Sequence, residues 1–270
     1  MNAPILVREA PLAHLRWGQG ERQVVLLHGV GGGREAWGDA ISGTGAALAE
    51  AGYTAIAVDL PGYGDSATIE PYDMAGLAAA VRALIAALPA RPCAVVGHSM
   101  GGMVAQELMA QAPGCVQALV LSCTSASFGK PDGAWQAEFL AQRLAPLDAG
   151  AGMARLAPGL ASGMASPTAP HDAVARAALL MSAVPEATYR RALQAIAGFN
   201  RRALLAELRL PVLCVAGEHD RNAPAALMQQ MAALIPGAVY QCLSGVGHLA
   251  NMEAPAPFNR ALVDFLQRRF

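Results

Sequence analysis

Short apolar runs recur along the chain and alternate with longer segments of helical periodicity. The runs are bounded by glycine, proline or polar residues and lack an in-and-out alternation, which is typical of strands covered on both faces of a parallel sheet. This order of strands and helices predicts a doubly wound α/β fold with right-handed crossovers. We expect strands over residues 24–27, 55–58, 93–97, 118–122, 212–216 and 240–243, and helices over residues 34–51, 72–88, 101–112, 223–234 and 253–269.

Two places depart from this regular alternation. Residues 6–8 and 12–17 have the pattern of an antiparallel hairpin at one edge of the sheet. Between about residues 128 and 202 the chain is rich in Ala, Gly, Pro and Met, has helical periodicity and shows no strand signal. An insertion of this length after a strand is usually functional. We therefore predict an α/β core formed by residues 1–127 and 203–270, with a helical cap over residues 128–202.

The clearest chemical signal is the motif Gly97-His98-Ser99-Met100-Gly101, which follows a predicted strand and precedes a predicted helix. In this context, a Gly-x-Ser-x-Gly motif is typical of a serine on a sharp, strained turn with its hydroxyl exposed above the sheet. The helix that begins after the serine favours negative charge developing beside it. Ser99 is therefore the predicted nucleophile.

A serine hydroxyl needs a general base, and His248 is the best candidate among the six histidines. It lies in a loop between the last predicted strand and the last predicted helix. His28 and His98 flank the same site. We expect His28 to hold the loop after its strand through a backbone hydrogen bond, and the side chain of His98 to point away. His14 and His171 have no supporting motif, and His219, beside Asp220, is expected to line its loop and not to catalyse.

The base needs a carboxylate that orients it. Asp220 follows the predicted strand over residues 212–216, and ligand sites form at the carboxyl ends of the strands in open α/β sheets. Glu218, two residues nearer the strand, is the alternative acid. We expect Asp59 and Asp65, by contrast, to shape a turn.

Two backbone N–H groups can hold the negative charge of a tetrahedral intermediate. The N–H of Met100 lies at the start of a predicted helix, and that of Val30 lies in the glycine-rich loop over residues 28–33. This loop lacks the residues of a phosphate-binding or dinucleotide-binding motif. No cluster of His, Cys and carboxylates has metal-ligand spacing, so we expect neither a metal nor an organic cofactor.

Five motifs together resemble the α/β-hydrolase superfamily over essentially the whole chain. The motifs are Leu27-His28-Gly29, Asp59-Leu60-Pro61-Gly62-Tyr63-Gly64-Asp65-Ser66, Gly97-His98-Ser99-Met100-Gly101-Gly102, Gly217-Glu218-His219-Asp220 and Gly247-His248. The order Ser99, Asp220, His248 is also the order of the catalytic triad in that family. Motif spacing and the predicted cap resemble 3-oxoadipate enol-lactonases, cofactor-free haloperoxidase-type esterases and meta-cleavage-product hydrolases. Residues 199–270 are most similar to the enol-lactonase group.

This resemblance implies a serine hydrolase that cleaves a small-molecule carboxylic ester or lactone through an acyl-enzyme at Ser99. Within the same machinery, the alternatives are C–C bond hydrolysis of meta-cleavage products and perhydrolysis, in which peroxide replaces water. A ligand receptor on a hydrolase fold is the alternative from another class, and the intact triad argues against it.

The cap is expected to supply an apolar pocket. Trp135 is placed like a tryptophan of the enol-lactonase pocket, and Arg143 and Arg155 are the candidates for binding an anionic substrate group. The predicted lining residues are Phe128, Trp135, Phe139, Met164, Met181 and Phe199.

Composition excludes several other classes of protein. The chain has 270 residues, of which 54% are hydrophobic, so it can bury a large core and is not disordered. Its formal net charge of −1 and the lack of a basic stretch exclude a nucleic-acid partner. No apolar stretch is long enough for a membrane span, and no leader pattern is visible, so we expect a cytoplasmic protein. Cys93, Cys214 and Cys242 are expected to be buried and reduced, and the oligomeric state stays open.

Overall fold

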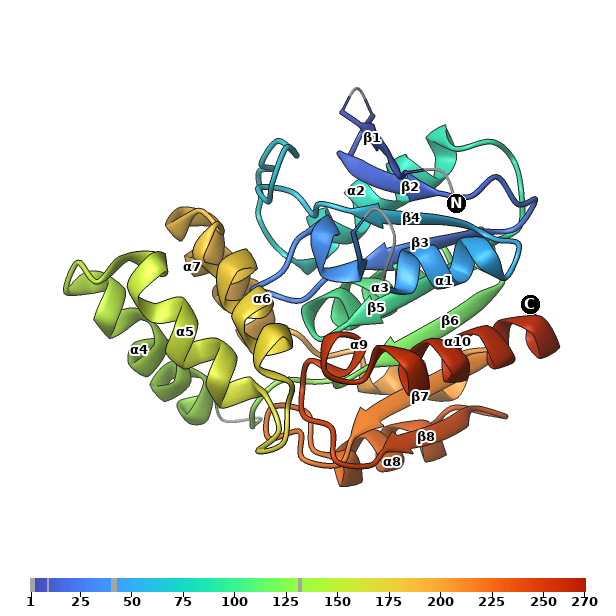
Figure 1. The fold of residues 1–270 in the computed structure, drawn as a ribbon. Coiled ribbons are helices and arrows are strands. Elements are labelled where there is room, and N and C mark those ends of the chain that lie inside the picture. The colour runs from blue at the N-terminus through green and yellow to red at the C-terminus, as the bar shows by residue number, and fades with distance from the viewer. Residues whose placement is uncertain (1–2, 9, 40–42, 131–132) are drawn as a thin grey trace.

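The computed structural model describes residues 3–8, 10–39, 43–130 and 133–270. Its strands form one sheet in the order β1-β2-β4-β3-β5-β6-β7-β8, which runs through the body of the molecule in Figure 1. β1 pairs with β2 and β2 with β4 in antiparallel fashion, and the other pairs are parallel. These pairings confirm the predicted fold class and the predicted edge hairpin. The strands are β1 (Ile5–Val7), β2 (His14–Trp17), β3 (Gln23–Leu27), β4 (Thr54–Val58), β5 (Cys93–His98), β6 (Ala118–Ser122), β7 (Val212–Gly217) and β8 (Val239–Leu243).

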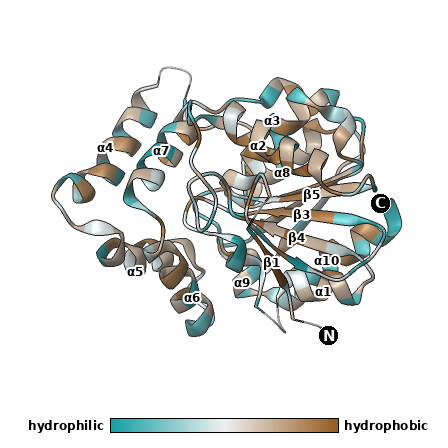
Figure 2. Cartoon of the chain, turned by 90° about the horizontal axis from the view of Figure 1, so that it is seen from above, coloured by the Kyte–Doolittle hydropathy of each residue, from teal (hydrophilic) through white to brown (hydrophobic). Residues whose placement is uncertain are grey.

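Helices cover both faces of the sheet, as Figure 2 shows from above. One face carries α2 (Met74–Ala87), α3 (Met100–Gln111) and α8 (Ala225–Leu234), and the other carries α1 (Thr44–Glu50) and α10 (Pro255–Arg269). Successive strand residues therefore enter two different cores. In β3, for example, Val25 and Leu27 face the first core, whereas Val24 and Leu26 face the second. Burial on both sides explains why the strands lack polar alternation.

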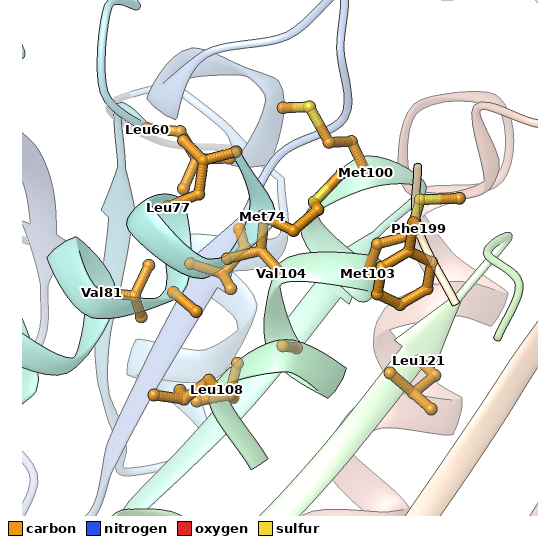
Figure 3. Packing of buried hydrophobic residues seen from close by; sticks show 14 of the residues in the cluster. Leu60, Met74, Leu77, Val81, Met100, Met103, Val104, Leu108, Leu121 and Phe199 are labelled. Carbon is orange, nitrogen blue, oxygen red and sulfur yellow. The ribbon is translucent and has the colours of Figure 1, made fainter. Parts of the chain in front are cut away.

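The first core is built where α2 meets α3 over the sheet. Figure 3 shows Leu77 and Val81 of α2 close to Val104 and Leu108 of α3. All four side chains are fully buried. This packing fixes α3, and therefore the turn at its start, against the centre of the sheet.

Two predicted helices are each divided in the structure. The segment over residues 34–51 contains a 3-10 helix, η1 (Arg34–Trp37), and the separate α1; residues 40–42 lie outside the described chain. The last predicted helix is divided into α9 (Ala250–Glu253) and α10. Pro255 begins α10, because proline has no backbone N–H to continue α9 and suits the first position of a helix. The remaining short helices are η2 (Pro113–Cys115) and η3 (Arg202–Glu207).

Four helices between β6 and β7 stand beside the carboxyl ends of the strands: α4 (Ala134–Asp148), α5 (Gly152–Met164), α6 (His171–Ser182) and α7 (Glu186–Ala197) (Figure 1). At their base, Ser127 and Asn200 form an isolated antiparallel bridge, and the N–H of Phe128 donates to the carbonyl of Phe199 at 3.0 Å. The chain thus leaves the core and returns to it at one place. This segment is the one for which a cap is predicted.

The cysteines follow their position in the sheet. Cys93 on β5 and Cys214 on β7 are buried, as predicted. The prediction for Cys242 is wrong, since its side chain is exposed. β8 is the edge strand of the sheet, and most of its residues are exposed. Among the described residues, no helix combines the length and the apolar character that a membrane crossing requires.

Candidate active site

Ser99 lies on the turn between β5 and α3. Its backbone has φ 53° and ψ −119°, a region that residues other than glycine rarely adopt. Two hydrogen bonds with residues at the end of the neighbouring strand β6 hold this turn. The N–H of Ser99 donates to the carbonyl of Ser122 at 2.9 Å, and the carbonyl of Ser99 accepts from the hydroxyl of Thr124 at 2.7 Å. The end of β6 therefore supports the strained residue.

The glycines of the motif make this turn possible. A Cβ atom on Gly97 would collide with the carbonyl of Gly101. A Cβ atom on Gly101 would in turn collide with the carbonyl of Leu27 at the end of β3. The motif therefore lets α3 begin directly against the sheet, as the sequence pattern indicates.

Ser99, His248 and Asp220 form a hydrogen-bonded series. The Nε2 atom of His248 lies 3.0 Å from Oγ of Ser99, and its Nδ1 atom lies 2.8 Å from Oδ2 of Asp220. The other carboxylate oxygen accepts the N–H groups of Asn222 at 2.8 Å and Ala223 at 2.9 Å. Because an ionised carboxylate only accepts, Nδ1 of His248 carries the proton and Nε2 is left to accept from the serine hydroxyl.

The environment keeps Asp220 ionised. Burial alone would raise its pKa, but the charge and hydrogen bond of His248, together with the two backbone N–H groups, lower the pKa below its usual value. Glu218, the alternative acid, is exposed and accepts from the hydroxyl of Ser244 and the N–H of Gly245, both at 2.7 Å. The structure therefore brings Asp220, and not Glu218, to His248.

Val30, which lines the same cavity as Ser99, and Met100, the next residue after Ser99, each have a backbone N–H without a partner in the described chain. Gly29 brings the glycine-rich loop close to the serine, since a Cβ atom at Gly29 would lie 3.1 Å from Cβ of Ser99. Met100 is the first residue of α3, so its N–H has no acceptor within the helix. No hydrogen bond among the described residues uses the N–H of Val30 or of Met100.

Residues of the turn after β4 form hydrogen bonds with the glycine-rich loop. Nδ1 of His28 donates to the carbonyl of Gly29 at 2.8 Å, which confirms its predicted role, and Nε2 accepts the N–H of Leu60 at 3.0 Å. Burial lowers the pKa of His28 to about 4, so the ring is neutral, as this pair of bonds requires. The buried hydroxyl of Tyr63 donates to the carbonyl of Val30 at 3.0 Å.

Asp59 shapes this turn, as predicted. Its buried carboxylate is ion-paired with the guanidinium of Arg34 and accepts the backbone N–H groups of Arg34 at 2.9 Å and of Asp65 at 3.1 Å. Asp65 also pairs with Arg34, at 2.8 Å. The network joins the end of the glycine-rich loop to the turn and takes no part in the series at Ser99.

The prediction that His98 points away is wrong. Its Nε2 atom donates to the backbone carbonyl of His248 at 2.8 Å, and the centres of the two rings are 5.0 Å apart. Burial, and then the neighbouring His248, lower the pKa of His98 to about 3. A neutral ring at this position therefore supports the loop that carries His248.

Glu253 also holds this loop, and the sequence analysis missed it. Its buried carboxylate accepts three backbone N–H groups, those of Gly247 at 2.9 Å, Leu249 at 3.0 Å and Ser166 at 2.9 Å. The first two flank His248, and the third belongs to the segment after α5. The signal in the sequence is a single carboxylate that follows the candidate histidine by five residues across a mainly apolar stretch.

A pocket that is partly open to solvent lies over Ser99. The glycine-rich loop, η1 and helices α5, α6 and α9 form its walls. Met164 and Met181 line it, as predicted. Its remaining apolar lining residues are Val30, Ala36, Trp37, Ala177, Leu249 and Met252.

The structure does not bring the other predicted lining residues to this cavity. The rings of Phe128, Trp135 and Phe139 pack on one another instead, with ring centres 5.0 to 5.5 Å apart. This is because α4 packs against α5 and α7 and not over Ser99. Figure 3 shows the fourth, Phe199, beside Met103 in the core. Arg143 stacks over Phe139, and Arg155 is exposed. The four predicted lining residues that lie away from the cavity are therefore Phe128, Trp135, Phe139 and Phe199.

Among the described residues, one cluster has the residue types of a metal site. Ligand atoms of His98, Cys123 and His248 all lie within 4.8 Å of one another. These donors do not suit a metal ion, because both nitrogens of His248 and one of His98 are in hydrogen bonds. Burial also raises the pKa of the Cys123 thiol well above its usual value, so the thiolate that binds metals is disfavoured.

Comparisons with known proteins agree with this site. A sequence model of the alpha/beta hydrolase family matches residues 24–261. A Variovorax paradoxus protein named as a carbamate hydrolase is 32% identical over 267 residues, covering 96% of this chain and 97% of that protein. A hydrolase from Pseudomonas aeruginosa superposes with a TM-score of 0.82 at 30% identity, covering 97% of this chain and 98% of the other. The enol-lactonase of Burkholderia xenovorans LB400 superposes with a TM-score of 0.81 at 23% identity, covering 97% and 100%, which shows the fold alone. The chain belongs to the α/β-hydrolase family and is an enzyme of the hydrolase class.

Proposed function

We propose that this hydrolase cleaves a carboxylic ester or lactone of a small molecule through an acyl-enzyme at Ser99. The observation that carries the proposal is the buried, hydrogen-bonded series of Ser99, His248 and Asp220. The N–H groups of Val30 and Met100, which have no partner among the described residues, support it.

In this proposal His248 acts as the general base. Nε2 takes the proton of the Ser99 hydroxyl as Oγ attacks the substrate carbonyl carbon. The new C–O bond leaves a tetrahedral intermediate whose negative oxygen is held by the N–H groups of Val30 and Met100. His248 then donates its proton to the leaving alkoxide as the C–O bond of the ester breaks. Each N–H donor contributes on the order of 10²–10³ in rate.

The second half of the reaction repeats these steps with water. His248 takes a proton from water as the water oxygen attacks the acyl carbon. The protonated ring then returns that proton to Oγ of Ser99 as the bond between Oγ and the acyl carbon breaks and the carboxylic acid is released. Asp220 holds the ring in the required tautomer and stabilises the imidazolium while it exists. Residues 128–202 act as a cap whose α5 and α6 wall the cavity from above.

The same machinery admits related carbonyl substrates. The relative named as a carbamate hydrolase makes a carbamate a second candidate, since its carbonyl is attacked in the same way. C–C bond hydrolysis and perhydrolysis use the same serine and base, and only the substrate assay separates them from ester cleavage.

The test is a panel of substrates with the Ser99→Ala variant as control. The purified enzyme is assayed on p-nitrophenyl acetate, p-nitrophenyl octanoate, 3-oxoadipate enol-lactone, a meta-cleavage product and a simple alkyl carbamate. We expect turnover of at least one ester, a burst of one p-nitrophenolate per Ser99, and loss of both in the folded Ser99→Ala variant. Ester turnover that survives in Ser99→Ala would contradict the proposal.

A further inference from the structure

We infer that the cavity over Ser99 accepts only uncharged substrate groups, so that the enzyme acts on neutral esters and rejects those carrying a carboxylate beside the scissile bond. The inference rests on the proposed function and narrows its substrate class. It is carried by the lining of the cavity, by the hydrogen bonds of its polar side chains and by the positions of the nearby arginines.

The lining is mainly apolar, and the described residues that form it include no aspartate, glutamate, lysine or arginine. Three methionines from three helices, Met164, Met181 and Met252, face the space together with Trp37 and Leu249. The residues outside the described ranges include no lysine or arginine, so every cationic side chain of the protein is accounted for. A carboxylate in this cavity would lose its hydration without gaining a cation.

The polar side chains of the cavity are already bonded. Both ring nitrogens of His28 have backbone partners, and Nε2 of His98 donates to a carbonyl. The amide nitrogen of Asn251 donates to the carbonyl of Ala36 at 2.7 Å. The carboxylate of Asp220 lies one hydrogen bond beyond His248, and its negative charge repels a second anion.

Arginines on η1 and α6, which wall the cavity, and on the neighbouring cap helix α7 have other partners. Arg176 sits on α6 next to the lining residue Ala177, but its guanidinium donates to the carbonyl of Glu35 at 2.6 Å and pairs with Asp39 at 3.6 Å. Arg34, at the end of the glycine-rich loop, is ion-paired with Asp59 and Asp65 in the turn after β4. The arginines of α7 are held in the same way: Arg190 pairs with Asp148 and Glu186, and Arg191 with Glu70.

One consequence concerns the enol-lactonase resemblance. 3-Oxoadipate enol-lactone carries a free carboxylate, and no cation of this chain lines the cavity that would receive it. We therefore expect this lactone to be a poor substrate, although the fold is shared with an enol-lactonase.

The experiment compares ester pairs that differ by one carboxylate. The first pair places the charge on the acyl side, as p-nitrophenyl pentanoate and mono-p-nitrophenyl glutarate. The second places it on the alcohol side, as phenyl acetate and 4-acetoxybenzoate. Each kcat/KM is divided by the rate of alkaline hydrolysis of the same ester. We expect the neutral ester to be preferred at least 30-fold in one pair, and a smaller preference in both pairs would overturn the inference.

A gain of function provides an independent test. Met252 lines the cavity and is half-buried on the short helix α9, so a longer polar side chain can reach the cavity from it. Met252→Arg is expected to reduce the preference for the neutral ester at least tenfold, whereas the uncharged control Met252→Gln leaves it within threefold. An unchanged preference in a folded Met252→Arg variant would count against the inference. Failure of the proposed function looks different, because then no ester is hydrolysed in a Ser99-dependent way.

Discussion

Glu253 provides the sharpest test of how the site is held together. Its carboxylate accepts backbone N–H groups from Gly247, Leu249 and Ser166 while 7% exposed. Glu253→Ala leaves these three donors without their acceptor. A buried donor that loses its partner costs about 1–3 kcal/mol, and the three together set an upper range of roughly 3–9 kcal/mol. Water entering the vacated space recovers part of this, so we expect a loss of about 3–5 kcal/mol in the free energy of unfolding.

The assay is urea unfolding followed by tryptophan fluorescence and by far-ultraviolet circular dichroism, with coincident transitions required before a free energy is assigned. Glu253→Gln keeps one accepting oxygen, and its amide group faces a backbone donor, so it should lose about 1–3 kcal/mol. The matched control is Glu207→Ala, which removes an exposed glutamate of η3 and should change stability by no more than about 0.5 kcal/mol.

Activity supplies a second readout for the same variants. Because two of the three donors flank His248, we expect kcat of folded Glu253→Gln to fall at least about tenfold, since small misplacements of a catalytic group are costly. KM should change less than kcat, because Glu253 does not line the cavity. A loss of stability below 1 kcal/mol in Glu253→Ala would refute the reasoning, whatever the activity.

Four further outcomes are expected. Asp220→Asn should lower kcat on the order of 10³–10⁴-fold by disturbing the histidine tautomer, and Glu218→Gln less than threefold; the reverse ranking in steady-state assays would show that the acid is misassigned. Tyr63→Phe removes the hydroxyl bond to the glycine-rich loop and should lower kcat/KM several-fold with a stability loss of about 1 kcal/mol, whereas an unchanged kcat/KM would exclude a positioning role. Folding lowers the pKa of His28 to about 4 and that of His98 to about 3, from a value near 6.5 in the unfolded chain. At pH values between the folded and the unfolded pKa, the unfolded state therefore binds more protons than the folded state. Unfolding free energy measured in urea should therefore fall by up to about 1.4 kcal/mol per pH unit for each histidine between pH 6.5 and 4, and a flat profile would contradict the buried neutral rings. Dialysis against EDTA should leave ester turnover unchanged, and loss that Zn²⁺ restores would reveal a metal requirement.

Sequence patterns located the strands closely because their cause is local. The strands from β3 to β7 each contain a continuous apolar run, and the boundaries from β3 to β8 lie within one residue of those expected. The divided helices were harder to foresee. Whether the periodicity over residues 34–51 continues or breaks depends on how η1 packs beside the glycine-rich loop, and periodicity does not encode that packing.

The pocket shows the limit of composition as a guide. Apolar residues of the segment over residues 128–202 are similar in type, yet Met164 and Met181 line the cavity while Phe128, Trp135 and Phe139 pack together elsewhere. Which face of a helix meets the active site depends on the docking of that helix, which no local pattern records. The same reasoning applies to Cys242, whose exposure follows from the edge position of β8.

The sequence by itself determined the fold class, the strained turn at Ser99 and the order of Ser99, Asp220 and His248 along the chain. Those features depend on motifs in which each residue acts through its own backbone geometry or its immediate neighbours, as with Gly97 and Gly101. Only the tertiary structure decided between Asp220 and Glu218. It also showed that His98 and Glu253 hydrogen-bond to the loop that carries His248, and that no lysine or arginine side chain lines the cavity. These outcomes depend on contacts between residues far apart in the chain, such as the N–H of Ser166 and the carboxylate of Glu253, whose separation is set by packing alone.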